Sequence, residues 1–162
     1  AIHEYPAAFQ SYWLDGMRKK IGLQSEEDGD VELVQQLLDW MQAASADFTK
    51  TFDDLSTDGH RNDLYRDEQF QSWHARWRGR VDRERSDPLA SDELMRSVNP
   101  SVIPRNHRVE EALLAATRDN DLCVMERLLA ALKSTFERDE KIADLRSPPP
   151  PGQSPYRTFC GT

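Results

Sequence analysis

The stretch SEEDGDVELVQQLLDWMQAASADF, residues 25–48, decides the fold class because its apolar residues recur at the spacing of one helix face. That face would carry Val31, Val34, Leu37, Leu38 and Met41. Asp30 stands just before this run, where a carboxylate can accept from the first free backbone N–H groups, so we expect it to be the N-cap. Residues 26–30 lack the alternating ligands and the terminal glutamate of a calcium loop, and we interpret them as a solvated acidic loop.

Apolar residues recur at helical spacing along most of the chain. No stretch alternates between apolar and polar residues as a half-buried strand does. Further helices are expected from Tyr5 to about Ile21, over residues 47–55, around Trp73 and Trp77, between Pro88 and Asn99, around Leu113, and from Leu122 to Phe136. The first of them should end at Gly22, and its spaced apolar residues are Phe9, Trp13, Leu14 and Met17. We therefore predict an all-α fold, an irregular bundle of about six to seven helices with an extended proline-rich C-terminal tail.

The composition indicates an ordinary soluble globular chain: 162 residues, 38% hydrophobic and 31% charged, with a net charge of -8. This acidic balance argues against nucleic acid as the main partner. No apolar run is long enough for a membrane span and no secretion signal stands at the start, so we expect neither membrane nor export. Two cysteines make no disulfide framework, which favours a cytoplasmic location. The start at Ala1 suggests a piece of a longer protein.

The domain organisation changes at Ser147. The segment SPPPPGQSPY, residues 147–156, cannot be helical and prefers polyproline II. We expect one helical domain over residues 1–146 and an extended tail over residues 147–162. Earlier prolines make residues 101–106 an extended connector.

No complete catalytic or metal site is expected in this chain. The four histidines are scattered, and none lies three or four residues from another. The sequence has no phosphate-cradling glycine-rich loop, and no serine or cysteine nucleophile stands beside a recognisable base. In WHARWRGRVDRER, residues 73–85, Trp73 and Trp77 align while the arginines spread around the helix. We interpret this as a core stripe whose marginal arginines pair with local acids such as Asp82 and Glu84.

Two short segments are candidates for a functional role. In NPSVIPRNHRVEEAL, residues 99–113, Asn106 is the expected N-cap of a helix, and Arg105 could in addition clamp a neighbouring element. His107 completes this interdomain or structural candidate. The chain closes on RTFCGT, where Cys160 is either an inert thiol in a frayed tail or an accessible group for redox exchange. Cys123 falls inside a helical pattern, and we expect a buried structural residue there.

Several stretches resemble the C-terminal region of the selenoprotein O family, also called the YdiU family. The resemblance covers nearly the whole chain in the same order and rests on MRKKIGL at residues 17–23, DFT at residues 47–49 with Phe52, NPSVIPRNHRVE at residues 99–110, SPPP at residues 147–150, and the closing residues 156–162. It implies a pseudokinase that binds ATP in a flipped orientation and, with magnesium, transfers AMP to protein hydroxyl groups. The ATP and metal residues would belong to a preceding kinase-like region that this chain lacks.

The resemblance also gives Cys160 a role, because eukaryotic members place selenocysteine third from the C-terminus and bacterial members commonly place cysteine there. It implies a redox function for Cys160 and a bacterial, cytoplasmic protein. The leading hypothesis is therefore a helical scaffold that packs against the missing kinase-like region and presents a redox tail, without catalysis or bound cofactor of its own. The alternative is a non-enzymatic interaction module that binds partner proteins through its helices and polyproline tail.

Overall fold

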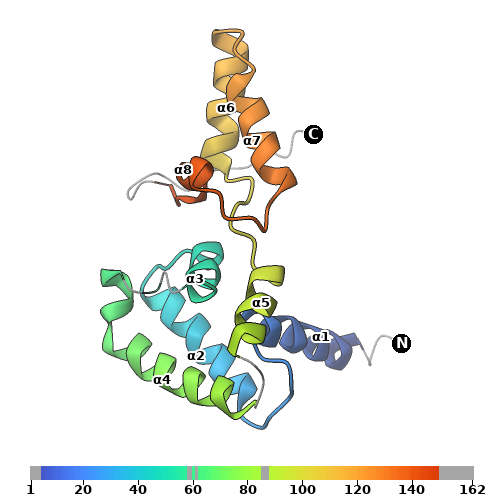
Figure 1. Cartoon of the computed structure of the whole chain (residues 1–162), viewed down its shortest axis with the longest axis vertical. Coiled ribbons are helices and arrows are strands. Elements are labelled where there is room, and N and C mark those ends of the chain that lie inside the picture. The colour runs from blue at the N-terminus through green and yellow to red at the C-terminus, as the bar shows by residue number, and fades with distance from the viewer. Residues whose placement is uncertain (1–4, 58–59, 61, 85–87, 150–162) are drawn as a thin grey trace. The chain divides into compact units, whose positions relative to one another are not determined.

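The protein was analysed as a computed structural model, which describes residues 5–57, 60, 62–84 and 88–149. The chain folds into two compact units, Ala1–Asn99 and Pro100–Thr162. Every regular element in the described residues is helical, so the predicted all-α class is confirmed (Figure 1). None of the helices in these residues is long and apolar enough to cross a membrane. The tail expected over residues 147–162 lies outside the described residues except for its first three, so its boundary stays a prediction.

The described residues of the first unit form five α-helices and one short 3₁₀-helix. In chain order they are α1 (Tyr5–Lys20), α2 (Asp30–Ala43), α3 (Phe48–Leu55), the 3₁₀-helix η1 (Asp63–Arg66), α4 (Glu68–Arg83) and α5 (Pro88–Val98). Helix α2 packs against α4, and α1 contacts both α2 and α5. Asp47 accepts a hydrogen bond from the backbone of Lys50 and so caps α3.

Aromatic side chains fill the core between α2 and α4. Trp73 and Trp77 are almost fully buried and their rings stack with centroids 5.6 Å apart, which confirms the predicted core stripe. Their indole N–H groups donate to the carbonyls of Leu33 and Ile21, each over 2.8 Å. Tryptophan therefore supplies both apolar area and satisfied hydrogen bonds at the junction of α1, α2 and α4.

Helix α1 ends as the sequence predicts. Gly22 has a φ of 76°, and the backbone N–H of Leu23 donates to the carbonyl of Arg18 over 2.9 Å, as in a Schellman motif. The Nδ2 of Asn99 donates to the carbonyl of Lys20 over 2.8 Å and so satisfies another carbonyl at the same end of α1. Of the apolar residues spaced along this helix, Phe9 and Trp13 are exposed, and the core contacts begin at Leu14 and Met17.

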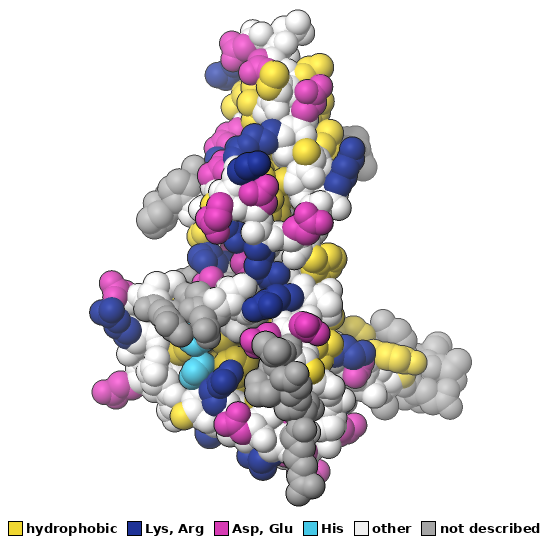
Figure 2. Space-filling view, in the orientation of Figure 1, with side chains coloured by type: hydrophobic (Ala, Val, Ile, Leu, Met, Phe, Trp, Pro, Cys, Tyr) yellow, Lys and Arg dark blue, Asp and Glu magenta, His cyan; other side chains and the backbone are white. Residues whose placement is uncertain are grey.

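The second unit is built around a helical hairpin. It contains α6 (Asn106–Arg118), α7 (Cys123–Lys133), the 3₁₀-helix η2 (Glu140–Ile142) and the single turn α8 (Ala143–Arg146). The non-helical segment before α6 is fixed where the N–H of Ser101 donates to the carbonyl of Thr135 over 2.8 Å. The small core of the second unit consists of Val102, Leu128, Ala131 and Leu145. Leu113 and Leu129 are about half exposed, and Figure 2 shows apolar side chains in yellow at the surface of this unit.

Candidate functional site

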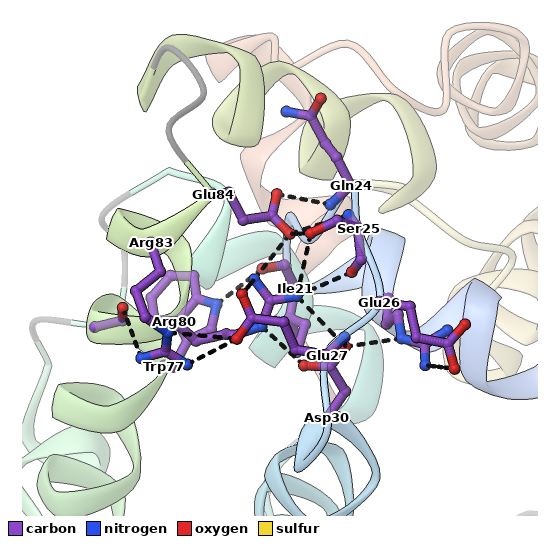
Figure 3. Close-up of polar contacts among 12 residues, drawn as sticks. Ile21, Gln24, Ser25, Glu26, Glu27, Asp30, Trp77, Arg80, Arg83 and Glu84 are labelled. Carbon is purple, nitrogen blue, oxygen red and sulfur yellow. Dashed lines mark hydrogen bonds and ion pairs between the residues drawn. The ribbon is translucent and has the colours of Figure 1, made fainter.

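The most elaborate polar arrangement in the described residues is a buried charge cluster formed by Arg18, Asp30, Arg80 and Glu84. Figure 3 shows Asp30, Arg80 and Glu84 of this cluster converging beside the loop that carries Ser25. The four residues of the cluster come from α1, α2 and the end of α4. Asp30 is 1% exposed and Arg80 is 3% exposed. Because a buried charge is costly unless it is paired, the geometry of each contact decides what this cluster does.

Asp30 lies at the centre of the buried charge cluster. Its Oδ1 accepts from Nε of Arg80, and its Oδ2 accepts from Nε of Arg18, both over 2.9 Å. The backbone N–H of Glu27 donates to Oδ2 over 3.0 Å. Both carboxylate oxygens are therefore engaged by charged or backbone donors, which is the arrangement that makes a buried carboxylate tolerable.

Glu84 ties the loop between α1 and α2 to the end of α4. Its carboxylate accepts from the backbone N–H groups of Gln24 and Ser25 over 2.9 and 3.0 Å, and from the Ser25 hydroxyl over 2.8 Å. Arg80 completes the link, because Nη1 donates to Glu84 and Nη2 donates to the Ser25 carbonyl, each over 2.9 Å. The prediction that an arginine of residues 73–85 pairs locally with Glu84 is confirmed, and that arginine is Arg80.

The acidic loop differs from its prediction in two ways. Glu26 forms an ion pair with Arg18 over 2.9 Å and Glu27 with Arg83 over 3.1 Å, so these residues are not simply solvated. Asp30 is not the N-cap of α2, because Gly29 holds that position with a φ of 96° and no side-chain cap is present. The two buried arginines draw the Asp30 carboxylate away from the helix end and satisfy it there.

Electrostatics keep the buried charge cluster ionised. Burial alone would raise the pKa of Asp30, but the hydrogen bond from Arg80, together with those from Glu27 and Arg18, outweighs burial and lowers the pKa. For Glu84, burial again opposes ionisation, and the backbone donors of Gln24 and Ser25 lower the pKa below its usual value. Carboxyl groups held this way stay charged at neutral pH and are poor general acids there.

A surface hollow of about 440 Å³ lies beside the cluster, between the start of α2 and α4. Its lining includes Asp28, Gln36, Arg76 and Arg83, together with the edges of Asp30 and Arg80. Within the part of the chain that the structure describes, no group of three or more His, Cys, Asp or Glu residues is placed to hold a metal ion.

The candidate segment at residues 105–107 begins α6, but not as predicted. Arg105 holds the N-cap position, and its carbonyl accepts from the backbone N–H groups of Arg108 and Val109 over 2.9 and 3.0 Å. Asn106 is exposed and is the first helical residue, so the prediction that it caps the helix is wrong. Burial, and then the charge of Arg108, lowers the pKa of His107. A contact from these residues to another domain stays a prediction.

The structure tests the prediction for only one of the two cysteines. Cys160, the redox candidate, lies outside the described residues. Cys123 was expected to be buried, and this is wrong because it is the exposed first residue of α7. The Asp121 side chain accepts from the Cys123 backbone N–H over 2.8 Å. A hydrogen bond with the Asp121 carboxylate, and then its negative charge, raises the pKa of the Cys123 thiol.

The sequence analysis did not predict the contact between Asp30 and Arg80. It interpreted Asp30 as a helix cap and the arginines of residues 73–85 as partners of nearby acids. Asp30 and Arg80 lie 50 positions apart, a separation that no helical period reveals. One signal was available: the acidic residues 26–30 and the arginine-rich residues 76–85 carry opposite charges and both adjoin predicted core helices. Complementary charge blocks of this kind favour a tertiary contact, although they do not identify the atoms involved.

Comparison with known proteins places the whole chain among related sequences. It is 44% identical to the protein nucleotidyltransferase YdiU of Bacillus cytotoxicus over 162 residues, covering 99% of this chain and 33% of the relative. The proteins of the same name from Syntrophotalea carbinolica and Geobacillus kaustophilus are 45% and 46% identical, each over 100% of this chain, with 33% and 34% of their own lengths covered. The chain thus spans about a third of the length of the curated relatives it matches. The family model described as protein adenylyltransferase SelO matches residues 1–133, and the chain therefore belongs to the SelO family.

Proposed function

We propose that this chain is the helical part of a protein adenylyltransferase that transfers AMP from ATP to hydroxyl side chains of other proteins. The observation that carries the proposal is the family match over residues 1–133, combined with coverage of only about a third of the relatives' length. The kinase-like region and the protein substrates would be the partners of the whole enzyme. This chain would act as a scaffold for that region, in a bacterial cytoplasm.

The packing of the first unit supports a scaffold role. The buried charge cluster joins α1, α2 and α4 through hydrogen bonds of about 3 Å, and the stacked tryptophans belong to the apolar core of the same unit. Buried, fully satisfied networks of this kind make a structure rigid. A rigid unit can present a fixed surface to the catalytic part of an enzyme, which benefits when its reacting groups are held precisely.

ATP and magnesium are the cofactors expected for the whole enzyme. The hollow beside the buried charge cluster does not fit magnesium, because no three of the described acidic side chains converge there and both oxygens of Asp30 already accept from arginine side chains. Those guanidinium groups are themselves held by Asp30 and Glu84. ATP and magnesium would therefore bind in the remaining part of the enzyme.

Cys160 is proposed as a redox regulator of AMP transfer. Under oxidised glutathione, its thiolate would displace glutathione thiolate to form a mixed disulfide, and a second cysteine in the catalytic region would then displace the remaining glutathione. Each exchange passes the electron pair to the leaving sulfur, so the net change is one protein disulfide and two reduced glutathione molecules. Mass spectrometry should find Cys160 linked, and Cys160→Ser should abolish the redox dependence of AMP transfer. Unchanged dependence in that variant would exclude the role.

The enzymatic proposal is tested by labelling with ATP that carries a label in its α-phosphate. We would compare this chain with a chimera in which it replaces the matching segment of the Geobacillus kaustophilus relative. The chimera should transfer labelled AMP to protein, and the chain alone should not. Transfer by the chain alone would overturn the scaffold assignment, and an inactive chimera beside the active relative would show that this chain cannot support catalysis.

The second unit favours one alternative, a non-enzymatic interaction module. Leu113, Leu114 and Leu129 are about half exposed on α6 and α7, and exposed apolar side chains of this size often mark a binding surface. A module of this kind would bind partner proteins whether or not a catalytic region is attached. It would be favoured if the relative's catalytic part labels protein equally well with and without this chain.

A further inference from the structure

The part of α1 before its core contacts stands out because its side chains at residues 8–13 are exposed. The first core contacts come from Leu14 and Met17. Figure 1 shows this part of the helix extending away from α2 and α5. Short helical segments are marginally stable in water without tertiary packing. A projecting helical segment of this kind requires a reason in the longer protein.

The projecting half of α1 carries an aromatic face, made of Phe9, Tyr12, Trp13 and Gly16. Tyr12 is 80% exposed, Phe9 is 57% exposed and Trp13 is 37% exposed. Phe9 lies three and four positions before Tyr12 and Trp13, and Gly16 lies four and three positions after them, so all four share one side of the helix. Aromatic residues contribute large apolar areas and are enriched in protein interfaces.

Gly16 gives this face a second distinguishing feature. No heavy atom lies within 4 Å of the position that a Cβ would occupy there, so nothing inside the unit requires a glycine. Glycine lowers the stability of a helix interior relative to alanine. It does permit another backbone to approach the helix closely, between the side chains of Tyr12 and Trp13. The contrast with Gly22, whose Cβ would meet Ser91, shows that the two glycines of this region serve different purposes.

We propose that the aromatic face of α1 docks onto the part of the full-length enzyme that lies outside this chain, with Gly16 as the point of closest backbone approach. The length of the relatives indicates what covers this face. They are about three times as long as this chain, and their matching segments include α1, so most of each relative lies outside the region matched here. The partner surface would be an apolar groove that admits a helix. This inference rests on the proposed function for the existence of that catalytic part.

Hydrogen exchange tests the docking in this chain alone and in the chimera with the Geobacillus kaustophilus relative. The amides of residues 8–16 should exchange at least about tenfold more slowly in the chimera, because docking suppresses local unfolding of the helix. Equal exchange in the two proteins would overturn the proposal. If the chimera does not fold, the same comparison between that relative and its own matching segment decides the question.

Two leucine substitutions separate docking from helix stability. Gly16→Leu should leave the melting temperature of the chain alone unchanged or higher, because leucine favours helix and the site is open. In the chimera it should abolish the slowed exchange of α1. Ser11→Leu adds the same side chain on the opposite, exposed side of α1 and should preserve that protection. Equal effects of the two variants would contradict docking through the aromatic face.

The remaining outcomes distinguish this inference from its alternatives. If sedimentation shows that the chain dimerises and that Gly16→Leu prevents it, the occupant is a second copy and the proposal fails. AMP transfer measured on the same chimera separates the two proposals. AMP transfer without slowed exchange in α1 would reject docking and retain the enzymatic function. Slowed exchange in α1 without AMP transfer would retain docking and reject the enzymatic function.

Discussion

The Nε of Arg80 donates to Oδ1 of Asp30 over 2.9 Å, although the two residues lie 50 positions apart and both are buried. Arg18 binds the other oxygen of the same carboxylate. A single acidic side chain therefore binds two guanidinium groups from two helices. Its removal would leave both of them in a buried environment without that carboxylate.

Asp30→Ala should lower the free energy of unfolding by about 3–5 kcal/mol, the usual result of removing one partner of a buried ion pair. Urea unfolding followed by tryptophan fluorescence measures the change. Asp28→Ala is the matched control, because Asp28 is exposed in the same loop and its loss should cost less than about 0.5 kcal/mol. Similar losses in the two variants would show that the cluster does not stabilise the fold.

The same carboxyl groups should make stability fall at acidic pH. The pKa values of Asp30 and Glu84 are lowered in the folded protein, so the unfolded chain binds more protons as the pH decreases. Their contribution is fully present above the unfolded pKa values, about 3.9 for aspartate and 4.3 for glutamate, and is lost as the pH falls through the lower folded values. Urea midpoints should therefore drop below about pH 5. Glu84→Gln should show a shallower drop, and an identical pH profile would contradict this assignment.

Gly22 and Gly16 should respond oppositely to alanine. Gly22 has a φ of 76°, and its Cβ would overlap the hydroxyl of Ser91, which itself donates to the Gly22 carbonyl over 2.9 Å. Gly22→Ala should therefore destabilise the protein by more than about 1 kcal/mol. Gly16→Ala should stabilise the chain by up to about 1 kcal/mol, because the site is helical and open. Thermal unfolding of the two variants measures both effects, and a stable Gly22→Ala protein would contradict the crowding at Ser91.

Cys123 should react with a thiol reagent in the folded protein, because it is exposed. The nearby carboxylate of Asp121 raises the pKa of the Cys123 thiol and so reduces the reactive thiolate near neutral pH. Asp121→Asn should therefore increase the labelling rate at pH 8. The measurement uses a Cys160→Ser background, so that only one thiol is present. A folded protein that resists labelling until it is denatured would restore the original expectation of a buried cysteine.

Local sequence patterns predicted much of the fold because helices are stabilised by neighbours three and four positions apart. The helical positions of Trp73 and Trp77 followed from their spacing alone, and their burial is confirmed. Gly22 ends α1 as expected, since its left-handed conformation is one that glycine adopts readily. The resemblance that rests on residues such as 17–23 and 99–110 also indicated the family that the comparisons show.

Only the tertiary structure decided which charges meet and which apolar residues stay outside. Asp30 carries the sequence signs of a helix cap, yet two arginines from other helices bind its carboxylate. Phe9 and Trp13 have the spacing of a buried face, yet α1 projects beyond its unit before reaching the core. The physical reason is common to both cases: periodicity determines which side chains share a helix face, whereas the packing of distant segments determines what that face contacts.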